Sequence, residues 1–95
     1  MVQQTKTLLG LWPLVTYGGH YVVEDLETSY LSAYGGGTQG SPGTMIGLIK
    51  DLIDGLNAKH CHTQAQEPCV NPLSQLISFE CFQEACIFTK KSAEQ

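Results

Sequence analysis

A short apolar run between a glycine pair and an acidic pair is the feature that most limits how this chain can fold. Tyr21, Val22 and Val23 follow the Gly18-Gly19 pair and are followed directly by Glu24-Asp25. Aromatic and β-branched residues bounded by a turn and by charge are typical of a short strand buried on both faces, as in a parallel sheet. We therefore predict a strand over residues 20–26 that carries an acidic pair at its end.

The acidic pair is a candidate metal site. Successive strand side chains point to opposite faces, so Glu24 and Asp25 cannot share one apolar layer, and burying an unpaired charge is costly. The carboxyl ends of strands are where open α/β sheets bind ligands. Two carboxylates there suit Mg²⁺, Mn²⁺ or Ca²⁺, which prefer oxygen ligands. The alternative is that both side chains face solvent or cap the next segment.

Two helices are expected on either side of this strand. Residues 2–15 are typical of the end of a helix. Apolar residues recur at spacings of three and four from Met45 to Leu56, which predicts a second, amphipathic helix. Its expected start is a cap at the Ser41-Pro42 pair, and its expected stop is Asn57.

The end of the chain predicts an antiparallel hairpin. Leu76–Phe82 and Ala85–Lys90 are strand-like, and two residues connect them. A parallel strand needs parallel neighbours and crossover helices, and the chain offers no such neighbour for the first strand. We therefore predict that residues 1–95 form a single partial domain, the C-terminal part of a larger α/β fold. The open sheet edge is expected to favour self-association.

Composition excludes several classes of function. The chain has a net charge of −4 and five lysines, with no arginine, which argues against nucleic-acid binding. No apolar run approaches the ~20 residues of a membrane span, and no signal peptide is recognisable. We expect a soluble, cytoplasmic protein. Its four cysteines are accordingly expected to be reduced thiols, with Cys81 and Cys86 only packing in their strands.

The segment 27–43 is rich in Gly, Ser, Thr and Tyr, and a loop of this length is typically functional. Residues 35–40 match G-x-G-x-x-G, but they do not lie directly between a strand and a helix, which argues against dinucleotide binding. A flexible loop or lid is expected instead. Tyr30 and Tyr34 in this loop either line a substrate pocket or anchor the loop by ring packing.

A second cluster of metal-binding residue types lies further along the chain. His60, Cys61, His62 and Cys69 are zinc-ligand types, but their spacing fits no standard zinc finger and adjacent ligands crowd a tetrahedral site. A solvated loop is the favoured interpretation of this segment.

Three segments together resemble a known family. They are Leu11-Trp12-Pro13-Leu14, the run GGHYVVEDLETSY that ends at Tyr30, and Tyr34-Gly35-Gly36. They resemble class I S-adenosylmethionine (SAM)-dependent O-methyltransferases of the macrolide-sugar type, the macrocin and mycinamicin methyltransferases. The resemblance extends over about residues 8–90, with a divergent stretch at residues 58–74.

The resemblance implies a fold and a reaction. The fold is the C-terminal half of a Rossmann-like class I methyltransferase: a helix, a parallel strand, a helix and an antiparallel strand pair. Glu24 and Asp25 would be ligands of Mg²⁺ or a similar divalent metal. Thr28, Ser29, Tyr30 and Tyr34 would lie in a substrate loop. The reaction would methylate a hydroxyl of a small sugar or polyol-like substrate, with SAM as methyl donor.

The departures from the family pattern limit this expectation. The glycine-rich cofactor turn and the Asp-Asp-x-Ser-His-like segment have no match here, so no catalytic or SAM-binding residue is assigned. We therefore expect the 95-residue chain to be inactive by itself. The alternatives are a non-catalytic remnant or interaction module, and a small metal-binding protein that uses the His60–His62 segment with Cys69.

Overall fold

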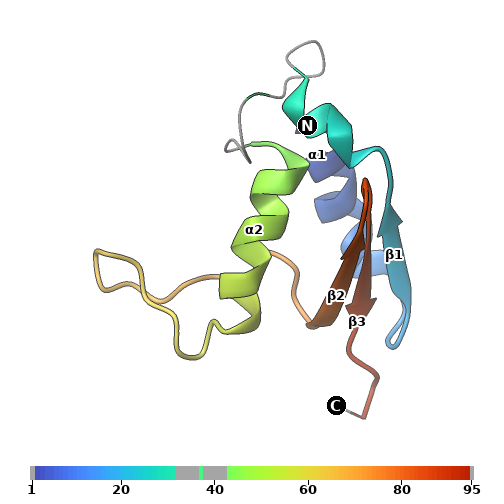
Figure 1. Cartoon of the computed structure of the whole chain (residues 1–95). Helices are drawn as coiled ribbons and strands as arrows, with labels where there is room; N and C mark the ends of the chain where they lie inside the picture. The colour runs from blue at the N-terminus through green and yellow to red at the C-terminus, as the bar shows by residue number, and fades with distance from the viewer. Residues whose placement is uncertain (1, 32–36, 38–42, 95) are drawn as a thin grey trace.

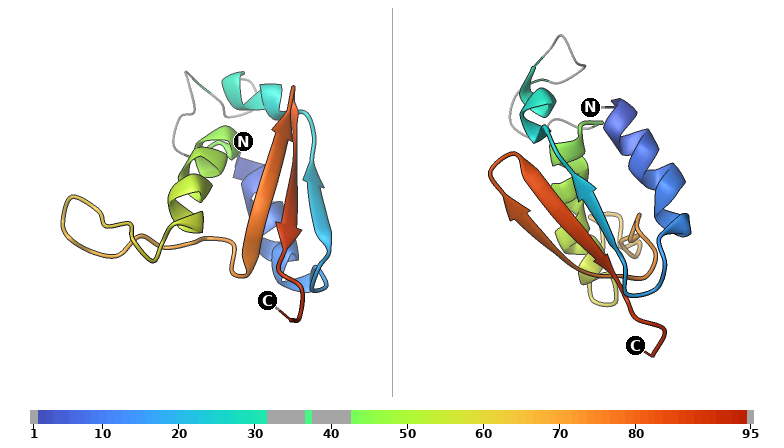
Figure 2. Two further views of the ribbon diagram at one scale, coloured as in Figure 1. Left: turned by 60° about the horizontal axis from the view of Figure 1, so that its bottom comes forward. Right: turned by 90° about the vertical axis from the view of Figure 1, so that its right-hand side faces the viewer.

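The computed structural model places two helices against one face of a three-stranded sheet (Figure 1; Figure 2). The structure describes residues 2–31, 37 and 43–94. Helix α1 spans Val2–Leu11 and runs into a 3₁₀ turn, η1, at Trp12–Leu14. Helix α2 spans Met45–Leu56, and a second 3₁₀ turn, η2, spans Leu26–Tyr30. Within the described residues, no helix is long and apolar enough to cross a membrane.

The sheet has its last strand in the middle. β1 spans His20–Val23, β2 spans Leu76–Phe82 and β3 spans Ala85–Lys90, in the order β1-β3-β2. The expected hairpin is confirmed, with Phe82 opposite Ala85. β3 is antiparallel to both neighbours, so β1 and β2 run parallel to each other without touching. In the described part of the chain, β1 therefore does have a partner, but an antiparallel one, and its outer edge has none.

One face of the sheet carries the core. Along β3 the side chains of Cys86, Phe88 and Lys90 are buried, which is the period of two expected for a strand covered on one side. On β1, Val23 is 6% exposed whereas Val22 is 55% exposed. The prediction that this strand is buried on both faces is therefore wrong for this chain, because both helices lie on the same side of the sheet (Figure 2).

Helix α2 starts later than the sequence indicated. Thr44 is its N-cap, and the Thr44 hydroxyl oxygen accepts a hydrogen bond of 3.0 Å from the N–H of Gly47. The cap expected at Ser41 and Pro42 falls outside the described residues. The expected stop is confirmed, since Asn57 is the C-cap. The helix buries Met45, Gly47, Ile49, Leu52 and Gly55.

All four cysteines are paired, which corrects the prediction of reduced thiols. Cys61 bonds to Cys69, and Cys81 bonds to Cys86. The second pair follows from the register, because the two-residue turn sets Cys81 directly opposite Cys86, with their Cα atoms 4.1 Å apart. The prediction of reduced thiols relied on the expected cellular compartment. Strand pairing, however, decides which sulfur atoms lie within bonding distance of each other.

The buried ammonium group of Lys90 connects strand β3 to the segment that follows helix α1. The Nζ atom of Lys90 donates hydrogen bonds to the carbonyl oxygens of Trp12 at 3.1 Å and Val15 at 2.9 Å. It also lies 5.4 Å from the centre of the Trp12 ring. The Trp12 carbonyl also accepts the N–H of Val15 at 3.0 Å, whereas the Val15 carbonyl lies past the last turn of η1. The side chain of Lys90 therefore caps η1 and fixes it against β3.

We expect Lys90→Met to lower the free energy of unfolding by about 2 kcal/mol, because the buried Trp12 carbonyl and the partly buried Val15 carbonyl lose a charged donor. Urea denaturation followed by Trp12 fluorescence measures the change. Lys59→Met is the control, since Lys59 is exposed and its loss is expected to stay within about 0.5 kcal/mol. Equal effects of the two substitutions would show that Lys90 does not anchor η1.

Candidate metal and substrate site

The acidic pair lies between two buried anchors at the C-terminal end of β1. Val23 and Leu26 are 6% and 4% exposed, whereas Glu24 and Asp25 between them are both exposed. The N–H of Leu26 donates a hydrogen bond of 3.0 Å to the carbonyl of Glu84 in the β2–β3 turn. Figure 1 shows this turn and η2 at the same end of the sheet. The backbone that carries the two carboxylates is therefore fixed from both sides.

Asp25 has a left-handed backbone conformation, with a φ of 56°. Aspartate tolerates this region better than most residues, yet it remains an uncommon choice outside glycine. The change of backbone direction ends the strand alternation that would keep Glu24 and Asp25 on opposite faces. Non-glycine residues in such conformations cluster at ligand-binding sites, which agrees with a role for this pair in binding.

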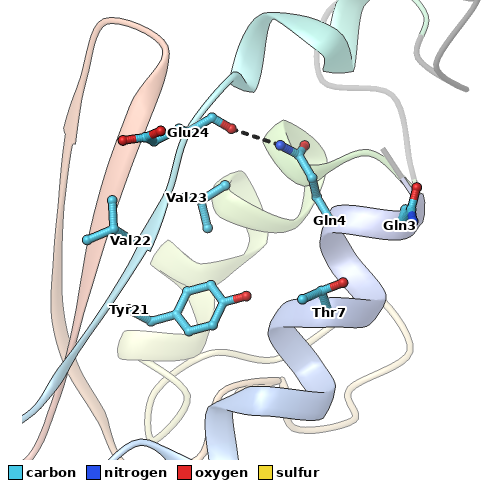
Figure 3. Close-up of a pocket in the computed structure, with 7 residues that line it drawn as sticks. All are labelled: Gln3, Gln4, Thr7, Tyr21, Val22, Val23 and Glu24. Carbon is cyan, nitrogen blue, oxygen red and sulfur yellow. Dashed lines mark hydrogen bonds between the residues drawn. The ribbon is translucent and has the colours of Figure 1, made fainter.

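Helix α1 supports the same strand end through Gln4, which the sequence did not single out. The Gln4 side-chain amide donates a hydrogen bond of 2.8 Å to the carbonyl oxygen of Glu24, while the Glu24 carboxylate points away from Gln4 (Figure 3). Nothing local to the Gln4 sequence reveals this contact, because it joins residues 20 positions apart.

A cleft of about 340 Å³ runs along the outer edge of β1 (Figure 3). It is lined by Gln3, Gln4, Thr7, Tyr21, Val22, Val23 and Glu24. Three consecutive strand residues and the following Glu24 line it, which places it at the strand's edge rather than on one face. Burial raises the pKa of Tyr21 above 10.0, so its phenol stays neutral at physiological pH.

The predicted substrate-loop residues have different surroundings. Ser29 is fully buried, and its hydroxyl oxygen accepts a hydrogen bond of 3.3 Å from the N–H of Ile46 at the start of α2. Tyr30 is 49% exposed and lines a second cleft between η2 and α2. Thr28 belongs to η2, and Tyr34 lies outside the described residues. Tyr30 is therefore available to a ligand, whereas Ser29 packs the turn against α2.

The alternative zinc site is not supported. Cys61 and Cys69 are bonded to each other, so neither sulfur offers a thiolate to a metal. His60 and His62 lie on the loop that extends away from the sheet beyond α2 (Figure 1). Across the described residues, no group of three or more His, Cys, Asp or Glu side chains is arranged to hold a metal. His20 lies at the opposite end of β1 from the acidic pair, where its Nδ1 contacts the Thr89 hydroxyl at 3.0 Å.

Comparison with known proteins identifies the relatives of this chain, although no protein-family model matches it. It is 35% identical over 83 residues, 87% of its length, to 8-demethyl-8-alpha-L-rhamnosyl tetracenomycin-C 2'-O-methyltransferase of Streptomyces olivaceus. It is 46% identical over 48 residues, 48% of its length, to mycinamicin VI 2''-O-methyltransferase of Micromonospora griseorubida. The chain is a relative of the sugar O-methyltransferases. The resemblance seen in the sequence is thereby confirmed.

Comparison of the fold with solved structures leads to the same group of methyltransferases. The structure of MycE methyltransferase from the mycinamycin biosynthetic pathway, solved with Mg and SAH, covers 94% of the chain with a TM-score of 0.76 and 26% identity. A complex that also contains mycinamycin VI gives a TM-score of 0.74 at 25% identity. The chain has the α/β fold of a part of a class I methyltransferase. It spans 22% of the length of the S. olivaceus relative and 23% of the MycE chain.

The left-handed conformation at Asp25 generates a stability test. We expect Asp25→Ala to be less stable than Asp25→Gly by about 1 kcal/mol, since only alanine has a Cβ atom that opposes a positive φ. Both variants lack the carboxylate, so the difference between their stabilities reports on the backbone conformation at position 25 alone. At Glu24, which is not in that region, alanine should be the more stable of the two. The stabilities are measured by thermal unfolding. If the alanine and glycine variants had the same order of stability at positions 24 and 25, this backbone geometry would be contradicted.

Proposed function

We propose that this chain is the metal-bearing part of a SAM-dependent sugar O-methyltransferase, in which Glu24 and Asp25 bind Mg²⁺ or a similar divalent ion. The observation that carries the proposal is the fixation of the acidic pair. Val23 and Leu26 are buried on either side of it, and hydrogen bonds from Gln4 and to Glu84 hold its backbone. Support also comes from the fold it shares with MycE, a methyltransferase solved with Mg and SAH.

The residues present fit the chemistry of a hard cation. Glu24 and Asp25 offer carboxylate oxygens, which Mg²⁺ prefers, and both are exposed at the strand end. Two carboxylates leave most of an octahedral site to water, substrate and other groups. A metal bound there would orient neighbouring substrate hydroxyls and favour the alkoxide form of the nucleophile. Tyr30, half-exposed on η2, would form part of the wall that excludes water from the substrate.

The same proposal names a substrate and a methyl donor. The substrate is a hydroxyl on a sugar or polyol-like small molecule, and the methyl donor is SAM, held by parts of the enzyme other than this chain. The 95 residues alone are accordingly proposed not to transfer methyl groups. Self-association through the open edge of β1 stays a prediction. A non-catalytic interaction module remains the alternative function, favoured by the same edge of β1, which pairs with no other strand among the described residues.

A chimera tests the function. The matching segment of the S. olivaceus relative is replaced by this chain, and methyl transfer from SAM to the relative's own substrate is measured with Mg²⁺ present. We expect activity in the chimera, and a loss on the order of 100-fold in kcat/KM on Glu24→Gln, because a carboxylate ligand becomes a neutral amide. Glu94→Gln, an exposed residue near the end of the chain, is the control and should leave the rate unchanged.

Folding of each chimera is checked by circular dichroism and by SAM binding. A chimera that folds and binds SAM but transfers no methyl group would contradict the proposal. Full activity of the Glu24→Gln chimera would contradict the assigned role of the acidic pair.

A further inference from the structure

The disulfide between Cys81 and Cys86 lies at the same end of the sheet as the acidic pair. Cys86 on β3 is paired with a residue on each side, Cys81 on β2 and Val23 on β1. Val23 is the buried residue that directly precedes Glu24. The disulfide therefore joins β2 to β3 at the register position where β3 also holds the end of β1.

The turn that this disulfide closes holds the other side of the acidic pair. Glu84 belongs to the turn, and its carbonyl oxygen accepts a hydrogen bond of 3.0 Å from the N–H of Leu26. Leu26 is the buried residue that directly follows Asp25. Both buried residues that flank the acidic pair are thus held by the disulfide-closed end of the hairpin.

The sequence of this turn does not favour its backbone conformation. Gln83 and Glu84 connect the two strands, and Glu84 has a left-handed backbone with a φ of 65°. Glutamate is disfavoured in this region because its Cβ atom crowds the backbone. Two-residue hairpin loops usually place Gly or Asn at such positions. The disulfide therefore supplies a restraint that the turn residues themselves do not.

Opening this disulfide leaves the rest of the hairpin in place. Its cysteines are five positions apart, and a disulfide that closes so short a loop removes little entropy from the unfolded chain. Further from the turn, the rings of Phe79 and Phe88 pack with their centres 5.8 Å apart, and Phe88 is fully buried. The effect of reduction is therefore confined to the end of the hairpin that holds the acidic pair.

The disulfide can be reached by a reductant. Cys81 is exposed, whereas Cys86 is buried. Both cysteines line an apolar cleft of about 530 Å³ between η2, α2 and the hairpin, whose walls include Leu26 and Ile49. A thiolate that reduces a disulfide must reach one of its sulfur atoms. Cys81 is therefore the sulfur that an external thiolate attacks.

We propose that the Cys81–Cys86 disulfide is a redox switch for the acidic pair: the disulfide holds the pair in its metal-binding geometry, and reduction releases it. The reductant is a dithiol. One of its thiolates attacks Cys81 and displaces Cys86, and its second thiolate then displaces Cys81 as the dithiol forms its own disulfide. The dithiol gives up two electrons and two protons, and both cysteines become thiols. The inference rests on the proposed function, because it assigns a regulation to the same metal site.

Amide hydrogen exchange tests the switch without metal. The isotope-labelled 95-residue chain is compared by NMR in its oxidised form and after reduction by dithiothreitol under nitrogen. We expect the Leu26 amide to exchange about tenfold faster in the reduced form, because its acceptor at Glu84 is no longer held. The Lys90 amide is the internal control. It donates to the Gly19 carbonyl at the other end of β3 and should exchange at the same rate in both forms.

Manganese binding measures the consequence at the metal site. We expect the reduced chain, separated from dithiothreitol, to bind Mn²⁺ about fivefold more weakly, because binding must then also order the acidic pair. The second disulfide provides the matched control: Cys61→Ser combined with Cys69→Ser should keep the full redox dependence. Cys81→Ser combined with Cys86→Ala should bind Mn²⁺ as the reduced chain does, in both conditions. The comparison of the two redox forms of the unaltered chain stands even if a variant does not fold.

Three results would overturn the switch. They are resistance of the Cys81–Cys86 disulfide to dithiothreitol in the folded chain, equal exchange rates of the Leu26 amide in the two forms, and equal Mn²⁺ affinity of the two forms at the acidic pair. Failure of the proposed function has a different signature. Neither form would then bind Mn²⁺ at the acidic pair, although the Leu26 amide would still respond to reduction.

Discussion

Everything in this structure depends on β3, the last strand in the sequence and the middle strand of the sheet. Its two edges pair with β1 and β2, and Phe88 at its centre is fully buried beneath the helices. Lys90 at its end caps η1, which fixes the N-terminal segment to the C-terminal strand. Without β3, β1 would have no strand partner within the described residues, and the acidic pair would have no fixed position.

This arrangement brings two kinds of site to one end of the sheet. β1 and β2 run in the same direction on either side of β3, so the end of β1 and the β2–β3 turn lie together. The contact between Leu26 and Glu84 joins them. The acidic pair thus faces outward beside the edge of β1 that has no strand partner in the described ranges, while the apolar cleft lies on the helix side. Both features lie within the part of the fold that the chain shares with MycE methyltransferase.

The sequence predicted those parts that depend on local pattern. The bounds of β2 and β3 and the end of α2 were correct, because strand alternation, a two-residue turn and a capping residue are local signals. The sequence did not predict contacts between residues that are far apart along the chain. The exposure of Val22, the pairing of β1 with β3 and the contact of Gln4 with Glu24 depend on the packing of distant segments. The disulfide between Cys81 and Cys86 was missed although the predicted hairpin already implied their proximity.

We propose that Glu24 and Asp25 form part of a divalent-metal site, and paramagnetic broadening by Mn²⁺ reports on that site. As Mn²⁺ is titrated into the isotope-labelled chain, we expect the amide signals of residues 24–26 and of Glu84 to broaden first, and Glu24→Gln to remove this preference. Asp51 and Asp54 on α2 are an internal comparison, being carboxylates of the same chain outside the site. Broadening that begins at those aspartates, or at His60 and His62, would contradict a metal site at Glu24 and Asp25.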